Sequence, residues 1–168
     1  SKKKRVMLTE YIKKNALDWS VGFVKAKEID DINILQASFK AMHNALDNLQ
    51  KVVPEHILVD GHMFKPYYHP ASEDFITHNC IIEGDNKFLS IAAASILAKE
   101  ARDDYLLTLH NKHDYLKKYG WDKNKGYATK QHRMAILEHG ITKYHRQTFG
   151  ICKRMLQTFK LNQEKQEK

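Results

Sequence analysis

The stretch His56-Ile57-Leu58-Val59-Asp60-Gly61 places an aspartate and a glycine directly after a short run of apolar residues. A second stretch has the same pattern, because Cys80-Ile81-Ile82 is followed closely by Gly84-Asp85. Short apolar runs that end at turn residues are typical of buried strands. Helical patterns alternate with these runs along the chain, so the sequence predicts an α/β layer architecture.

Apolar side chains at three- and four-residue steps predict a long helix over residues 28–50. They are Ile29, Ile32, Leu35, Phe39, Met42, Leu46 and Leu49. Similar patterns predict helices over residues 4–14, 91–110, 131–139 and 149–161. We also predict a strand over residues 19–24, and loops over residues 62–78 and 112–130.

Composition excludes several classes of protein. The chain has 168 residues, of which 42% are hydrophobic, and this suits one domain with a real core. No apolar run approaches the ~20 residues of a membrane helix, and no apolar stretch follows the basic start as in a secretory signal. Two cysteines, Cys80 and Cys152, do not make a disulfide framework. We therefore expect a reducing, cytoplasmic location.

The net charge of +8 is concentrated in two places. Residues 1–14 and residues 112–133 each carry a net charge of +5, and the rest of the chain is slightly acidic. Aromatic residues are interleaved with the second cluster: Tyr115, Tyr119, Trp121 and Tyr127. Basic side chains neutralise phosphates and aromatic rings stack on bases or sugars, so this mixture favours a nucleic-acid partner. A solvated basic surface with aromatic anchors is the alternative.

Asp60 and Asp85 each end a predicted strand beside a glycine. If the two strands are parallel neighbours, both carboxylates face one crevice at the carboxyl edge of the sheet. Two close carboxylates repel unless a cation lies between them, and Mg²⁺ or Mn²⁺ prefers such oxygen ligands. Paired metal ions can hydrolyse a phosphodiester. The alternative is that both Asp-Gly pairs are only turn residues.

These stretches belong to a longer series of motifs. In chain order the series comprises Ser1-Lys2-Lys3, residues 28–30 and 32–37, Val59-Asp60-Gly61, Gly84-Asp85-Asn86-Lys87, residues 90–99, Arg102-Asp103, Lys125-Gly126-Tyr127-Ala128-Thr129-Lys130 and His145-Arg146-Gln147-Thr148-Phe149. The series resembles that of ribonuclease HII, and the resemblance extends from residue 1 to about residue 150. Residues 90–99 and 125–130 carry its most specific motifs.

The resemblance implies a ribonuclease H-like α/β fold, with a mixed sheet flanked by helices, over residues 1–150. Residues 151–168 would form a helix end and a disordered polar tail. It implies an endonuclease that hydrolyses the RNA strand of RNA–DNA hybrids and cuts 5′ of single ribonucleotides in duplex DNA. Members of the family use four carboxylates to hold two Mg²⁺ or Mn²⁺ ions, and Asp60 and Asp85 match the third and fourth. We expect a monomer when the fold is complete.

The resemblance also assigns residues that contact substrate. Tyr127 matches the tyrosine that recognises the ribose at an RNA–DNA junction, where only a 2′-hydroxyl distinguishes RNA from DNA. Four lysines are expected phosphate contacts: Lys2, Lys3, Lys125 and Lys130. Asp103 is a candidate supporting carboxylate behind the metal ligands, and Lys87 is a candidate for orienting Asp85.

The sequence departs from the family at one point. Family members begin with a strand that bears an Asp-Glu pair and continues into a Gly-Arg-Gly turn, and this chain contains neither. That strand is central in the sheet and supplies the first two metal ligands. We therefore expect that the chain lacks two N-terminal strands and is inactive by itself. Two further alternatives remain: a non-catalytic nucleic-acid-binding module and an α/β protein that binds a nucleotide or another small molecule.

Overall fold

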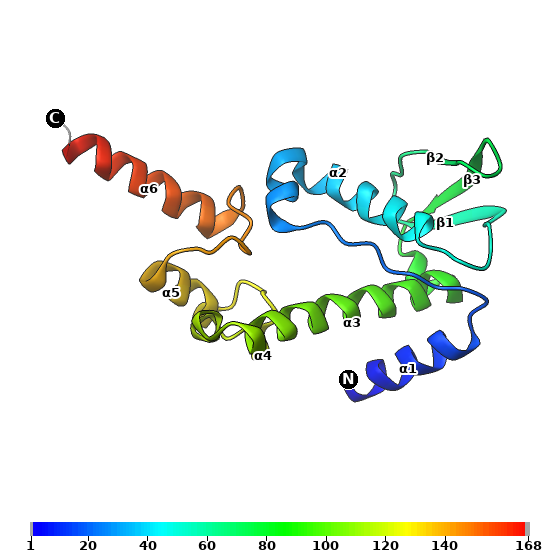
Figure 1. Cartoon of the computed structure of the whole chain (residues 1–168), viewed down its shortest axis with the longest axis horizontal. Coiled ribbons are helices and arrows are strands. Elements are labelled where there is room, and N and C mark those ends of the chain that lie inside the picture. Colours follow the sequence, from blue (N-terminus) through cyan, green and yellow to red (C-terminus); the bar gives the residue numbers. More distant parts are fainter. Residues whose placement is uncertain (1, 167–168) are drawn as a thin grey trace. The chain divides into compact units, whose positions relative to one another are not determined.

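The computed structural model describes residues 2–166, with side chains as far as residue 158 (Figure 1). The chain forms two compact units. The first comprises residues up to 23 together with residues 38–102, and the second comprises residues 24–37 together with everything from residue 103 onward. The two units are described in turn.

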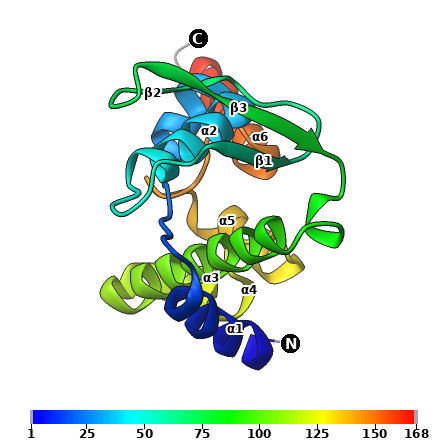
Figure 2. The ribbon, with the colours of Figure 1, turned by 90° about the vertical axis from the view of Figure 1, so that its right-hand side faces the viewer.

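A mixed three-stranded sheet forms the centre of the first unit. Its strands are β1 (His56–Asp60), β2 (Tyr67–His69) and β3 (Asp74–Ile81), in the spatial order β1-β3-β2. β3 pairs in parallel with β1 and antiparallel with β2. Figure 2 shows β1 and β3 running in the same direction. β1 ends at Asp60 and β3 ends four residues before Asp85, so the condition set for the two aspartates to share one edge, parallel neighbouring strands, is met.

The helices of the first unit are α1 (Lys2–Asn15), the later part of α2 (Ala26–Asp47) and the beginning of α3 (Leu89–Lys112). An ion pair of 2.6 Å joins Arg5 Nε on α1 to Oε2 of Glu100 on α3. The Glu100 side chain is only 8% exposed, so this charge is paired where water is scarce. This ion pair links the basic helix α1 to α3.

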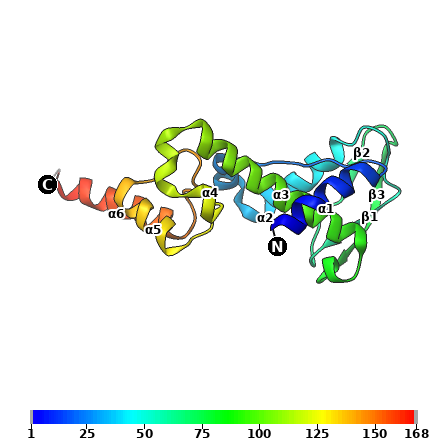
Figure 3. The same cartoon turned by 90° about the horizontal axis from the view of Figure 1, so that it is seen from below.

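The second unit is built around aromatic side chains. It contains η2 (Asp114–Tyr119), α4 (Trp121–Asn124), α5 (Lys130–His139) and α6 (Gly150–Gln166), the last three of which are labelled in Figure 3. Leu116, Tyr119 and Trp121 are almost completely buried, and Ile136 of α5 and Cys152 of α6 pack in the same cluster. Two of the interleaved aromatics, Tyr119 and Trp121, are therefore core residues of this unit.

The beginning of α2 is held in the second unit by Asp30. Its carboxylate accepts hydrogen bonds from the backbone N–H groups of Gln147 and Thr148, at 2.7 and 2.9 Å, and from the Thr148 hydroxyl at 2.6 Å. These bonds join two of the sequence motifs, residues 28–30 and residues 145–149.

Two predictions of local structure are wrong. Residues 19–24 form no strand, because this apolar segment packs against α2: Ser20 Oγ donates to the Ala45 carbonyl and Asn44 donates to the Phe23 carbonyl. Residues 62–78 are not all loop, because they contain β2 and the first part of β3. Pro66 and Pro70 flank the short strand β2 rather than interrupting it.

The long helix is also divided. Asn33 has a non-helical backbone (φ 67°, ψ 166°), and its side-chain oxygen accepts the N–H groups of Leu35 and Gln36. The asparagine therefore caps the second part of α2, where periodicity alone predicts an uninterrupted helix. The predicted loop over residues 112–130 contains η2 and α4. α6 extends to Gln166, and the last two residues of the expected polar tail lie outside the described range.

Gly22 permits the closest approach of the 19–24 segment to α2. A Cβ at this position would overlap the Ala41 carbonyl oxygen and lie 2.7 Å from the Ala45 backbone nitrogen. Gly22→Ala should lower the free energy of unfolding by about 3 kcal/mol, because backbone atoms of a helix cannot move aside.

Urea unfolding would measure this loss, with Gly150→Ala as the control. Gly150 has φ +45° but open space around it, so its substitution should cost only about 1 kcal/mol of backbone strain. Equal losses for the two variants would contradict the packing explanation.

Candidate functional site

Asp60 ends β1 at the carboxyl edge of the sheet, opposite Ile81 of β3. The pairing continues one residue further, because Gly61 N–H donates to the Ile81 carbonyl at 2.9 Å. Beyond Ile81 the chain turns back, and the N–H of Gly84 donates to Oδ1 of Asp60 at 2.9 Å. The turn that contains Asp85 is therefore bonded directly to the Asp60 carboxylate.

The geometry of this turn depends on two residues beside Asp85. Glu83 has a left-handed backbone (φ 54°), which starts the short helix η1 (Gly84–Asn86). Gly84 is buried, and a Cβ there would lie 2.6 Å from Ile91 Cδ1 and 3.4 Å from Asp60 Oδ1. Glycine thus lets the turn pack against both α3 and the carboxylate of β1.

The two aspartates differ in their surroundings. Asp60 is exposed and Asp85 is half-buried. Lys87 lies in the same turn, and its Nζ donates to the Ile82 carbonyl at 2.8 Å. The role of Lys87 in orienting Asp85 stays a prediction. Asp103 lies on α3 in the other unit and is half-buried.

Carboxylate oxygens on neighbouring strand ends fit a divalent metal ion, because Mg²⁺ and Mn²⁺ prefer hard oxygen ligands. Across residues 2–166 no group of three or more histidine, cysteine, aspartate or glutamate side chains is arranged to hold a metal ion. Asp60 and Asp85 both carry carboxylate oxygens of the kind that these ions prefer.

The predicted substrate contacts in the second unit surround α4 and the start of α5. Tyr127 is 61% exposed, while its backbone N–H donates to the Asn124 carbonyl at 2.9 Å. Lys125 Nζ donates to the Asp122 carbonyl at 2.6 Å, and Lys130 is exposed at the first position of α5. In the first unit, Lys2 and Lys3 are exposed on α1.

Two buried histidines behind Tyr127 were missed by the sequence reasoning. His132 and His145 are 5% and 6% exposed, and their Nε2 atoms lie 3.3 Å apart. Burial lowers the pKa of His132, and burial together with the neighbouring His132 lowers the pKa of His145 to about 4. Both imidazoles are therefore neutral at pH 7. Their separation of thirteen residues gives no periodic signal in the sequence.

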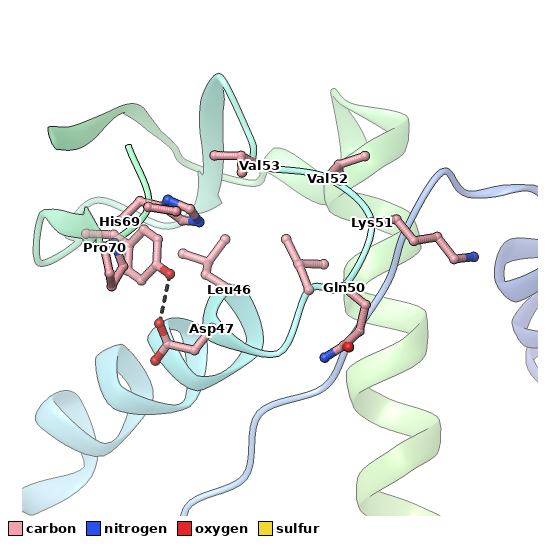
Figure 4. Close-up of a pocket in the computed structure, with 11 residues that line it drawn as sticks. Leu46, Asp47, Gln50, Lys51, Val52, Val53, His69 and Pro70 are labelled. Atoms are coloured by element: carbon pink, nitrogen blue, oxygen red, sulfur yellow. Dashed lines mark hydrogen bonds between the residues drawn. The ribbon is translucent and has the colours of Figure 1, made fainter. Parts of the chain in front are cut away.

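A pocket of about 470 Å³ lies elsewhere in the first unit, between the end of α2 and β2 (Figure 4). Asp47 lies on its wall and accepts a hydrogen bond of 2.8 Å from the Tyr67 hydroxyl. Burial, with the added effect of this bond, raises the pKa of the Tyr67 phenol to about 12. Figure 4 shows Lys51 pointing away from Asp47. Asp60 and Asp85 are not among the residues that line this pocket.

Comparison with solved structures identifies the class of fold. The crystal structure of ribonuclease H2 from Pyrococcus horikoshii OT3 superposes with a TM-score of 0.75, over 95% of this chain and 78% of that one. Sequence identity is 20%, so this likeness concerns the fold. The chain therefore has a ribonuclease H-like α/β fold, with a small mixed sheet and flanking helices.

Sequence comparison identifies the family. The family model described as Ribonuclease HII matches residues 1–154. Ribonuclease HII of Bacteroides thetaiotaomicron is 54% identical over 151 residues, covering 90% of this chain and 70% of that protein. The Christiangramia forsetii protein of the same name is 50% identical over 149 residues, covering 89% and 70%. The chain belongs to the ribonuclease HII family. Within the described residues, no helix is long and apolar enough to cross a membrane.

The neutral histidine pair makes stability depend on pH. In the unfolded chain an imidazole has a pKa near 6.5, whereas the pKa of folded His145 is about 4. As the pH falls from 6.5 to 4 the unfolded state takes up the proton first, so the free energy of unfolding should fall by about 2–3 kcal/mol.

Urea unfolding at several pH values would test this, with His145→Gln as the matched variant. The variant should be less stable at pH 7 but should lose less stability on acidification than the native chain. Identical pH slopes for the two proteins would contradict the assignment of a buried neutral His145.

Proposed function

We propose that this chain carries part of the active site of an endonuclease that hydrolyses the RNA strand of RNA–DNA hybrids and cuts 5′ of single ribonucleotides in duplex DNA. The observation that carries the proposal is the hydrogen bond from Gly84 to Asp60, which brings the Asp85 turn against a second carboxylate at the sheet edge. Membership of the ribonuclease HII family supports the choice of substrate.

Asp60 and Asp85 are the residues that would hold Mg²⁺ or Mn²⁺. A divalent pair supplies an activated water and stabilises the leaving oxygen of the phosphodiester. The chain's own contribution is to hold the ligands: the Gly84 N–H occupies one lone pair of Asp60 Oδ1 and leaves Oδ2 available for a metal ion. The parallel pairing of β1 with β3 supports this assignment, because it ends both strands at the edge where Asp60 lies and from which the Asp85 turn begins.

Tyr127 is the residue that would read the ribose. Its exposed ring can pack against a sugar and its hydroxyl can bond a 2′-hydroxyl, which DNA lacks. Lys2, Lys3, Lys125 and Lys130 would bind phosphates, with Asp103 and Lys87 supporting the metal ligands. Because phosphate binding releases counterions, affinity should fall with salt at a slope of roughly −0.9 per phosphate contact.

We further propose that the 168-residue chain cuts slowly or not at all by itself, because only two of the family's four carboxylates have counterparts in it. The purified chain, given Mn²⁺ and a duplex with one ribonucleotide, should leave the strand intact. Efficient cutting by this chain would contradict the proposal.

The carboxylates are tested in a chimera that adds the remainder of the Bacteroides thetaiotaomicron relative to this chain. The chimera should cut 5′ of the ribonucleotide, and Asp60→Asn or Asp85→Asn should each reduce kcat at least 100-fold with little change in KM. Asp74→Asn, an exposed carboxylate at the other end of β3, is the control and should leave kcat unchanged. Full activity of the Asp60→Asn chimera would exclude Asp60 as a ligand.

The second candidate function is binding of nucleic acid without cleavage, which the exposed basic helix α1 favours. It predicts salt-dependent affinity in EDTA and no cutting by the chimera. Cutting that depends on Asp60 and Asp85 would exclude it.

A further inference from the structure

The loop that carries Tyr127 is fixed by its backbone. Asn124 is buried and donates from Nδ2 to the Tyr119 carbonyl at 2.6 Å, while its Oδ1 accepts the Gly126 N–H at 2.8 Å. The carbonyl of Tyr127 lies near two donors: the N–H of Thr129 at 2.8 Å and Nδ1 of His132 at 2.9 Å. The exposed ring of Tyr127 is thus attached to a backbone that is fixed by hydrogen bonds to the residues around it.

The hydrogen bonds of His132 identify its tautomer. The indole Nε1–H of Trp121 can only donate, and it lies 3.1 Å from His132 Nε2. Nε2 is therefore the acceptor, and the proton of the neutral ring is on Nδ1, which donates to the Tyr127 carbonyl.

His145 supports the same arrangement. Its Nδ1 accepts the Thr142 backbone N–H at 3.0 Å, so its own proton is on Nε2 and is directed at His132 Nε2, 3.3 Å away. A proton on His132 Nε2 would point at the N–H groups of Trp121 and His145, and donors cannot bond to one another. These two neighbours therefore select the neutral form of His132 whose proton is on Nδ1 and is donated to the Tyr127 carbonyl.

We propose that His132 is a positioning residue for recognition of the ribose, because its Nδ1–H holds the Tyr127 carbonyl and so fixes the direction in which the Tyr127 ring is presented. This inference rests on the proposed function, in which Tyr127 reads the 2′-hydroxyl. Thr129 adds a second tie, since its hydroxyl accepts the His132 N–H at 3.2 Å and caps α5. His132 thus bonds the Tyr127 loop through its ring and the N-cap residue of its own helix through its backbone N–H.

A buried histidine can also serve only to fill the core, and the two roles predict different results. A core role predicts that every substitution lowers stability and affects all duplexes alike. A positioning role predicts loss of discrimination between a duplex with one ribonucleotide and the same duplex made only of DNA. It also predicts that an N–H donor at the Nδ1 position restores discrimination.

The experiment measures Kd for the two duplexes in EDTA by fluorescence anisotropy with the 168-residue chain, and takes the ratio of the two Kd values. Tyr127→Phe should lower this ratio about fivefold, the effect of one lost hydrogen bond.

His132→Gln places its amide nearer the Nε2 position and should lower the ratio by a similar factor. His132→Asn places an amide N–H nearer Nδ1 and should keep most of the ratio. The double variant Tyr127→Phe with His132→Gln should lose no more than either single variant.

Thermal melting of each variant and a Cys152→Ala control separate positioning from packing. Cys152→Ala disturbs the buried cluster of the second unit and leaves the bonds of His132 and His145 in place, so it should lower Tm and leave the ratio unchanged. The inference on His132 is overturned if Tyr127→Phe lowers the ratio and His132→Gln does not, or if the ratio follows Tm in all variants. A ratio that Tyr127→Phe leaves unchanged overturns the proposed role of Tyr127 and the inference with it.

Discussion

Parallel pairing of β1 with β3 is the constraint on which the candidate site depends. Asp60 and the turn that contains Asp85 lie at the same edge only because both strands run in the same direction and end in register, with Asp60 opposite Ile81. A shift of one residue would turn Asp60 to the opposite face of the sheet. Three backbone features after the strands then bring the turn that contains Asp85 against the Asp60 carboxylate: the Gly61–Ile81 hydrogen bond, the left-handed Glu83 and the buried Gly84.

A different kind of constraint shapes the second unit. There the rings of Tyr119 and Trp121 pack against two polar imidazoles, and burying such groups is unfavourable unless each finds a partner. His132 and His145 meet this requirement as neutral rings with fixed tautomers. The hydrogen bonds that offset the cost of their burial include the one from His132 Nδ1 to the Tyr127 carbonyl. The buried His132 ring therefore bonds the backbone of the Tyr127 loop, while the Tyr127 side chain itself is exposed.

Sequence reasoning succeeded where a short pattern determines the structure. Apolar runs followed by Asp-Gly or Gly-Asp predicted the strand ends, and the alternation of strands with helices predicted the α/β fold. It failed where packing decides between similar patterns. The apolar residues 19–24 could form a strand, but Gly22 and Ser20 pack them on α2 instead. The kink at Asn33 follows from a side-chain cap that periodicity does not detect.

The candidate site residues also differ in whether a short sequence pattern or only the folded chain reveals them. Asp60 and Asp85 could be proposed from the sequence because each follows an apolar run and adjoins a glycine. His132 and His145 were missed because their contact joins α5 to the segment after it, and only the folded chain brings their rings within 3.3 Å. Lys125 and Lys130 were correctly located in a basic region, but the sequence did not indicate that Lys125 Nζ bonds the Asp122 carbonyl.

The central claim is that the carboxylates of Asp60 and Asp85 together bind a divalent metal ion. The most direct measurement is a Mn²⁺ titration of the ¹⁵N-labelled chain, in which amide resonances near the bound ion broaden first. The account predicts early broadening of the Gly61 and Gly84 resonances, and its loss in the chain that carries both Asp60→Asn and Asp85→Asn. Early broadening centred on Asp47, or the same broadening in the doubly substituted chain, would contradict it.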